Sequence, residues 1–164
     1  VSSAKIEGRM KSVFYGATIV SAYRRAIDAY YEDPDNYVFD PSWMTELKKV
    51  SRREFTTGFY YNKPTDEDQN YQTSAYTRDY SFIGMVKEYD PETCMAVVEQ
   101  RNKMSVGEEI EVFGPGRDFF SQKLEVLLDE EGQPIESAPH PQQIVKIKMK
   151  EPVEKNFILR KRKS

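Results

Sequence analysis

The chain has 164 residues, of which 38% are hydrophobic, 31% are charged and 13% are aromatic. This composition is typical of a soluble domain, and no run of about 18 apolar residues predicts a membrane span. The single cysteine, Cys94, excludes a disulfide framework within the chain and any multi-cysteine metal site, which favours a cytoplasmic protein.

The formal net charge of −3 is unevenly distributed along the chain. Arg160, Lys161, Arg162 and Lys163 contribute +4 near the C-terminus, so the remaining residues carry −7, the difference between −3 and +4. We therefore expect the body of the protein to repel phosphate groups and its basic tail to attract them.

The first segment, Lys5-Ile6-Glu7-Gly8-Arg9, has the pattern of a buried strand that ends in a charged turn. A strand followed by an amphipathic helix is half of a strand-helix-strand unit, and such units bury both faces of the strand. Residues 1–33 are therefore interpreted as the closing unit of a larger α/β domain that lies outside this chain. The alternative is that Ile6-Glu7-Gly8-Arg9 is a cleavage sequence left from a gene fusion.

Two helices are predicted after this segment. Ser12 is a suitable N-cap for the first helix, which should end near Glu32 because Asp33-Pro34 follows. The apolar residues near one face of this helix are Val13, Ala17, Val20, Ile27 and Tyr31. Asp40 and Pro41 begin a second, shorter helix, which makes residues 34–52 a helical connector.

After Val50 the hydrophobic period changes from about 3.6 to 2, which predicts a β-domain over residues 53–164. Strands are expected at about 53–60, 82–89, 93–101, 108–113, 119–128, 143–150 and 156–160. The clearest pattern places Val145, Ile147 and Met149 in alternation with Lys146, Lys148 and Lys150, which predicts one buried and one cationic face. Short strands joined by tight turns favour a small, closed or nearly closed, mostly antiparallel barrel. The expected fold class is an α+β fragment.

Few residues are candidates for a catalytic or metal-binding role. Glu7 and Arg9 lie at the end of the expected strand, where they would either position a polar substrate or form a structural ion pair. His140 lies between two prolines and is expected to be structural, and Cys94 is expected to be a buried, inert thiol in a strand. No complete catalytic constellation, metal-ligand spacing or cofactor site is predicted.

The binding candidates are the four basic residues 160–163 together with Tyr71 and Tyr76, which lie in a long polar segment over residues 62–80. Cations that contact phosphates and tyrosines that stack on unpaired bases would form an RNA-binding surface. The simpler alternative is a solvated tail, with the tyrosines covering the barrel or docking it on a partner domain.

Several stretches of the chain resemble peptidase family U32, the collagenase-like proteases. The resemblance covers nearly the whole chain and rests on Lys5-Ile6-Glu7-Gly8-Arg9-Met10-Lys11-Ser12, Tyr23-Arg24-Arg25-Ala26-Ile27-Asp28, Ser51-Arg52-Arg53-Glu54-Phe55-Thr56-Thr57-Gly58-Phe59-Tyr60, Phe82-Ile83-Gly84-Met85-Val86, Arg101-Asn102-Lys103-Met104, Gly107-Glu108-Glu109-Ile110-Glu111-Val112 and Ala138-Pro139-His140-Pro141. It implies a catalytic α/β barrel preceding these residues, of which 1–33 would be the end. The family's cysteines have no counterpart here. The order of segments in 82–113 also looks like the second-domain barrel of translation factors.

The family resemblance implies an accessory domain that recognises substrate or braces the catalytic domain of a U32 peptidase, and that is inactive by itself. An alternative comes from relatives that support prephenate-dependent hydroxylation of transfer RNA uridine, in which this domain would hold the RNA. A third alternative is a self-association module. The expected partners are the catalytic domain of the same parent chain and a transfer RNA or protein substrate, without a membrane or a cofactor.

Overall fold

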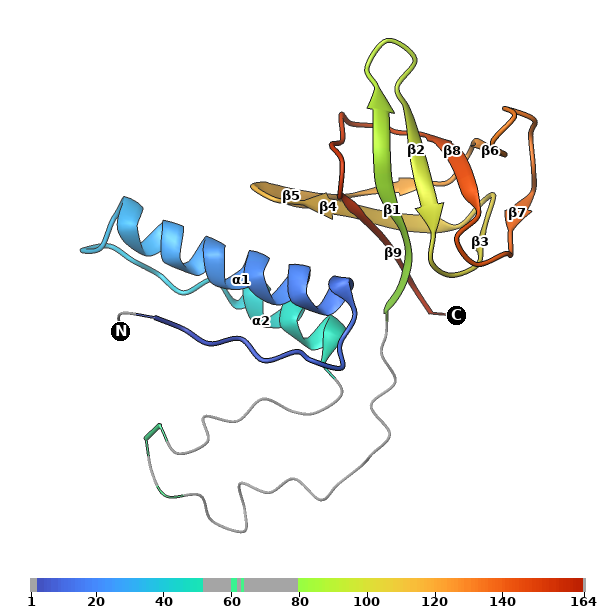
Figure 1. Cartoon of the computed structure of the whole chain (residues 1–164). Helices are drawn as coiled ribbons and strands as arrows, with labels where there is room; N and C mark the ends of the chain where they lie inside the picture. The colour runs from blue at the N-terminus through green and yellow to red at the C-terminus, as the bar shows by residue number, and fades with distance from the viewer. Residues whose placement is uncertain (1–2, 52–59, 62, 64–79, 164) are drawn as a thin grey trace. The chain divides into compact units, whose positions relative to one another are not determined.

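The computed structural model describes residues 3–51, 60–61, 63 and 80–163 (Figure 1). The chain divides into two compact units, Val1–Asp79 and Tyr80–Ser164. In the described residues, the first unit contains two helices and the second contains an antiparallel β-sheet, which confirms the expected α+β class. Neither of the described helices is long and apolar enough to cross a membrane.

The two helices are α1 (Val13–Glu32) and α2 (Pro41–Val50), which match the predicted helices. Asp40 caps α2, because its carboxylate accepts a hydrogen bond of 2.8 Å from the backbone N–H of Ser42. Pro41 occupies the first turn of α2, where its missing N–H costs nothing. The residues that the two helices bury are Phe14, Thr18, Ile19, Ala22, Trp43 and Val50.

The helical pair buries a different face of α1 from the one that the sequence pattern indicated. Val13 and Val20 belong to the predicted apolar face, yet they are 64% and 54% exposed. The buried side of α1 is built around Phe14 and Ala22 instead. The short helix α2 packs against one side of α1, and Val13 and Val20 lie outside this contact.

The strand expected at Lys5–Arg9 is not present among residues 3–12, which have no strand pairing. Ile6 is 40% exposed, so it is not a core residue here. A buried strand needs a hydrogen-bonded neighbour on at least one side, and no described segment of this chain pairs with these residues.

The second unit is built from nine strands. They are β1 (Tyr80–Asp90), β2 (Met95–Gln100), β3 (Met104–Ser105), β4 (Glu109–Gly114), β5 (Arg117–Lys123), β6 (Leu127–Leu128), β7 (Ser137–Ala138), β8 (Ile144–Lys148) and β9 (Ile158–Arg162). Seven of them form one sheet in the order β5-β4-β9-β1-β2-β8-β6, and β3 pairs with β7 (Figure 1). Five of the predicted strands correspond to β1, β2, β4, β8 and β9. The strand expected over 53–60 lies outside the described residues except for Tyr60, which is in a bend.

The turn between β1 and β2 corrects the prediction for Cys94. Asp90 accepts hydrogen bonds from the backbone N–H of Glu92 and from the hydroxyl of Thr93, and these bonds hold a turn that extends to Cys94. Cys94 itself has a positive φ of 58° and is partly exposed, so it is not a buried strand residue. The strand begins one residue later, at Met95.

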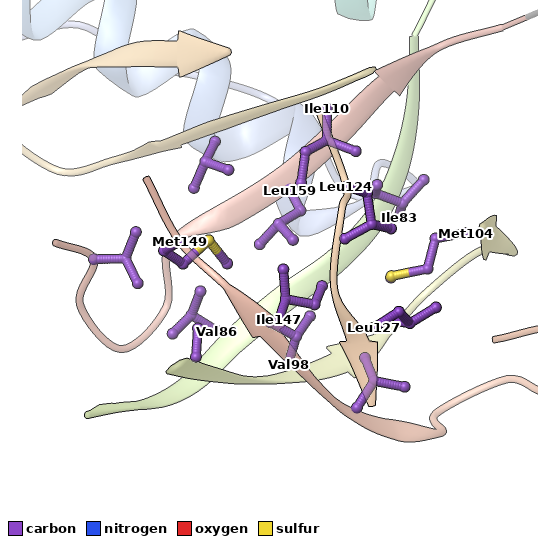
Figure 2. Close-up of a cluster of buried hydrophobic side chains, with 14 of the residues drawn as sticks. Ile83, Val86, Val98, Met104, Ile110, Leu124, Leu127, Ile147, Met149 and Leu159 are labelled. Carbon is purple, nitrogen blue, oxygen red and sulfur yellow. The ribbon is translucent and has the colours of Figure 1, made fainter. Parts of the chain in front are cut away.

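One hydrophobic core lies inside the curved sheet of the second unit. Figure 2 shows side chains from β1, β2, β4, β8 and β9 that point toward one another. Ile83, Val98, Ile110, Ile147 and Leu159 are all fully buried. Alternate residues of each strand enter this core, as the period of 2 predicted.

A closed or nearly closed barrel was expected, and no closed barrel is found among the described strands, because the strand order ends at β5 on one side and at β6 on the other. The strand predicted over 119–128 bends between Lys123 and Leu127, so β5 pairs with β4 whereas β6 pairs with β8. A single side chain links the β5 edge to the end of β8. The amide nitrogen of Gln122 donates to the carbonyl of Lys148, and its amide oxygen accepts from the N–H of Lys150, both at 2.8 Å.

We expect Gln122→Ala to lower the free energy of unfolding by about 1–3 kcal/mol, because it removes two hydrogen bonds and leaves backbone groups of residues 148–150 without these partners. Ser121→Ala is the matched control, since Ser121 is exposed on the same strand and should change stability by less than about 0.5 kcal/mol. Urea denaturation followed by far-UV circular dichroism measures both. Equal stability of the two variants would show that Gln122 does not hold this edge.

Candidate functional site

Three of the four basic residues predicted to bind phosphate, 160–162, belong to β9, which lies between β1 and β4 in the sheet, and Lys163 follows this strand. Their side chains therefore alternate between the two faces of the sheet. Arg160 is fully buried, Lys161 is partly buried, and Arg162 and Lys163 are exposed. The four cations do not project together from the end of the strand.

Arg160 lies in a cluster that combines one carboxylate with three aromatic rings. Its Nε and one terminal nitrogen each lie 2.6 Å from Oε2 of Glu111, and the hydroxyl of Tyr80 donates to the other carboxylate oxygen at 3.0 Å. The guanidinium carbon lies 4.8 Å from the ring centre of Phe113, 5.2 Å from that of Tyr80 and 5.3 Å from that of Phe119. These distances are typical of cation–π contacts.

The cluster explains how a charged residue fits inside the sheet. Glu111 neutralises the guanidinium, and the rings replace the water that would otherwise solvate it. Burial raises the pKa of Tyr80, and the hydrogen bond to Glu111 raises it further, so this phenol stays protonated as a donor. The arrangement is a structural support for β1, β4 and β9.

Lys161 is also occupied within the sheet. Its ammonium nitrogen lies 2.7 and 2.8 Å from the two carboxylate oxygens of Glu108. The expectation of four phosphate-binding cations is therefore corrected, because Arg160 is buried and Lys161 is held by an acidic partner. The exposed members of the basic tail are Arg162 and Lys163.

A second pair of cations lies on β8, where the predicted alternation is confirmed. Val145 and Ile147 enter the core, whereas Lys146 and Lys148 lie on the outer surface. Among the described residues, no ion pair joins either ammonium group to a carboxylate. We call Lys146, Lys148, Arg162 and Lys163 the outer cations.

Acidic side chains limit the positive potential near β8. Glu88 and Asp90 lie in the same cross-strand rows as Lys146 and Lys148, with β2 between them. Asp90 is already engaged by its own turn, and hydrogen bonds from Thr93 and Glu92 lower its pKa. Glu99 lies on the outer face of β2. The largest cause that lowers the pKa of Glu99 is its hydrogen bond from Lys87.

The two pairs of outer cations lie at opposite ends of β1. Arg162 is opposite Tyr80 at the start of β1, whereas the row of Lys146 reaches β1 at Glu88. At about 3.3 Å per residue, this separation along the strand is about 26 Å. A ligand that touched both pairs would have to be a long polyanion.

The other sequence candidates do not come together in a site. Glu7 forms an exposed ion pair of 3.5 Å with Lys5, and none of the described contacts joins it to Arg9. Tyr71 and Tyr76 lie outside the described residues. His140 is exposed in a turn, where its backbone N–H donates to the side chain of Gln143. In the part of the chain that the structure describes, no group of acidic, histidine or cysteine side chains is arranged to hold a metal ion.

The sequence contains a pattern that could have predicted the Arg160 cluster. Arg160 follows Ile158 and Leu159 in a short strand, and Glu111 lies between Ile110 and Val112. A charge inside a buried strand needs a partner of opposite charge. The sequence did not predict that β9 pairs with β4, so it did not identify Glu111 as the partner of Arg160.

Two family models match the chain. Residues 1–70 match "Peptidase family U32", and residues 78–160 match "Peptidase family U32 C-terminal domain". The chain belongs to peptidase family U32. The boundary between the two U32 matches lies close to the division between the two compact units.

Longer relatives share both parts of this U32 chain. The "tRNA hydroxylation protein P1" of Bacillus subtilis is 42% identical over 99% of the chain, and the "tRNA hydroxylation protein P" of Escherichia coli is 32% identical over 97%. A "Collagenase" of Porphyromonas gingivalis is 29% identical over 85%. The chain spans only 39%, 34% and 39% of these three proteins, respectively.

A crystal structure of the C-terminal domain of a U32-family protein from Geobacillus thermoleovorans is also similar. It is 46% identical, and the match covers 49% of this chain and 99% of that domain, with a TM-score of 0.48.

Arg160 and Arg162 provide a matched test of the buried cluster, because they have the same residue type on the same strand. We expect Arg160→Ala to lower the free energy of unfolding by about 3–5 kcal/mol, since Glu111 is left as an uncompensated charge. Arg162→Ala should change it by less than about 0.5 kcal/mol. Urea denaturation measures both, and a larger effect of Arg162→Ala would contradict the assignment.

Proposed function

We propose that residues 80–163 form an accessory, noncatalytic domain that holds transfer RNA for the catalytic part of a longer cytoplasmic U32 protein. The observation that carries this proposal is the relationship to the Bacillus subtilis tRNA hydroxylation protein P1, which extends over 99% of the chain. The Escherichia coli relative has a corresponding name.

The outer cations are the groups that would contact RNA. Lys146 and Lys148 on β8 and Arg162 and Lys163 at the end of β9 are not buried in the core. Their separation by about 26 Å along β1 is compatible with a folded RNA, whose backbone extends over several nucleotides in that distance. Acidic neighbours such as Glu88 reduce the local potential, so we expect modest affinity and strong dependence on salt.

Titration of fluorescently labelled, unmodified transfer RNA with the 164-residue chain tests this proposal. If all four outer cations contact phosphates, the slope of log affinity against log salt should be about −3, at about −0.7 for each contact. The variants Lys146→Ala/Lys148→Ala and Arg162→Ala/Lys163→Ala should each reduce the magnitude of the slope by about half.

The control is Lys103→Ala/Lys155→Ala, which removes the same charge from two exposed residues outside the strands. It should leave most of the binding unchanged. Absence of binding at every salt concentration, or equal losses in all three double variants, would contradict a specific role for the outer cations.

A protein substrate is the second candidate, and the relationship to the Porphyromonas gingivalis collagenase favours it. In that case the domain would recognise or brace a polypeptide for the catalytic part. On either proposal the domain is noncatalytic, so denatured collagen incubated with the chain should remain intact on gels. Cleavage that survives repurification would overturn the noncatalytic assignment.

A further inference from the structure

Three charged side chains form a network on the outer face of the sheet, between the two pairs of outer cations. Lys87 lies in a bulge of β1, Glu99 lies on β2, and Arg101 follows the end of β2. The ammonium nitrogen of Lys87 lies 2.9 Å from one carboxylate oxygen of Glu99, and a terminal nitrogen of Arg101 contacts the other oxygen. We call these three residues the Glu99 network.

The Glu99 network has a net charge of +1, because two cations share one carboxylate. The side chain of Glu99 is only 16% exposed, whereas those of Lys87 and Arg101 are 40% and 34% exposed. The hydrogen bond from Lys87 is the largest cause that lowers the pKa of Glu99, and the charge of Arg101 lowers it further, so the carboxylate stays ionised near neutral pH. The excess positive charge therefore lies on the two more exposed side chains.

The backbone around Arg101 is fixed by hydrogen bonds on both sides. Its N–H donates to the carbonyl of Ile83 at 2.8 Å, and the side-chain amide of Asn102 donates to a carbonyl of β1 at 2.6 Å. The preceding residue, Gln100, is buried, and its side-chain amide donates to the carbonyl of Ala138 at 2.9 Å. A guanidinium that is supported in this way and oriented by a carboxylate loses little conformational freedom when it binds a phosphate.

Arg101 divides the gap between the two pairs of outer cations. It bonds to β1 three residues after Tyr80, which is opposite Arg162, so the separation along β1 is about 10 Å. Along β2 it lies four residues after Val97, which is opposite Lys146, or about 13 Å. The whole gap of about 26 Å is more than twice the Debye length of about 10 Å at 0.1 M salt. The shorter intervals are close to that length, so Arg101 connects the positive potentials of the two pairs.

We propose that Arg101 is a further phosphate-binding residue of this domain, held in place by Glu99 and Lys87 between the two pairs of outer cations. This inference rests on the proposed binding of transfer RNA. A guanidinium has several N–H donors, so the contact with one oxygen of Glu99 leaves others that can bond to a phosphate. The RNA backbone would then cross the outer face of β1 and β2, and the charge of Glu99 would limit the affinity.

The edge strand β5 provides a matched ion pair for the experiment. Arg117 and Glu151 have side chains that are 41% and 40% exposed, and their charged atoms lie 3.5 Å apart. In the strand order, β4, β9 and β1 separate β5 from β2. The variants Arg101→Gln, Glu99→Gln, Arg117→Gln and Glu151→Gln are compared by titrating fluorescently labelled transfer RNA with the 164-residue chain at several salt concentrations.

Arg101→Gln should weaken binding about fivefold at 0.1 M salt and reduce the magnitude of the salt slope by about 0.7, the value of one phosphate contact. Glu99→Gln should strengthen binding, because the amide keeps an acceptor for Arg101 but has no charge. Arg117→Gln and Glu151→Gln should each change the affinity by less than about twofold. Equal effects of the two arginine variants, or of the two glutamate variants, would overturn the proposal, because such effects would report only the net charge of the chain.

Arg101→Lys separates a phosphate contact from a structural role of the guanidinium. Lysine keeps the positive charge, so the salt slope should be retained. A slope reduced as much as in Arg101→Gln would contradict the proposal. If Arg101→Gln does not fold, as measured by far-UV circular dichroism, the comparison of Glu99→Gln with Glu151→Gln decides the question.

The same titrations distinguish failure of this inference from failure of the proposed function. If the double variants of the outer cations lose affinity but Arg101→Gln does not, the domain still binds transfer RNA and only the role of Arg101 is wrong. If the unchanged chain binds no transfer RNA at any salt concentration, both proposals are wrong.

Discussion

Arg160 can lie in the middle of the sheet because Glu111 neutralises its charge there. The guanidinium is fully buried in β9, and the rings of Tyr80, Phe113 and Phe119 surround it. This cluster joins β1, β4, β5 and β9 on the face opposite the hydrophobic core. It also places the C-terminal residues of the chain in the sheet, which leaves Arg162 and Lys163 as the exposed part of the basic run.

The sheet of the second unit has no ladder of backbone hydrogen bonds that joins β5 to β6. The bend between β5 and β6 lets one stretch of chain pair with β4 and then with β8. The side-chain amide of Gln122 donates one hydrogen bond to the backbone of Lys148 and accepts one from the backbone of Lys150, as a paired strand residue would. The sheet thereby encloses one core, while β5 and β6 remain its edges. The cations of β8 and β9 lie on its outer surface.

The first unit has the opposite character, because it leaves apolar surface uncovered. Its short helix α2 buries one side of α1, whereas Val13 and Val20 are exposed. The sheet unit contains its own hydrophobic core. The chain belongs to family U32 and spans 39% of the Bacillus subtilis relative.

Much of the fold followed from periodicity in the sequence. The period of 3.6 identified α1 and α2, Asp33-Pro34 marked the end of α1, and the alternation of Val145 and Ile147 with lysines identified β8. These features are local, because they depend on backbone sterics and on which side of a single element is apolar. The family resemblance was also readable from local motifs.

Tertiary structure decided which side chains remain available for binding. Whether Arg160 projects into solvent or lies buried depends on the pairing of β9 with β4, which joins residues 49 positions apart in the chain. The position of Cys94 depended on hydrogen bonds within one turn, and the exposure of Val13 and Val20 depended on which side of α1 the helix α2 covers. The amino-acid sequence by itself determined the helices, most strands and the family. Contacts between distant segments determined the burial and charge of the candidate site, because burial is a property of neighbours and not of a residue alone.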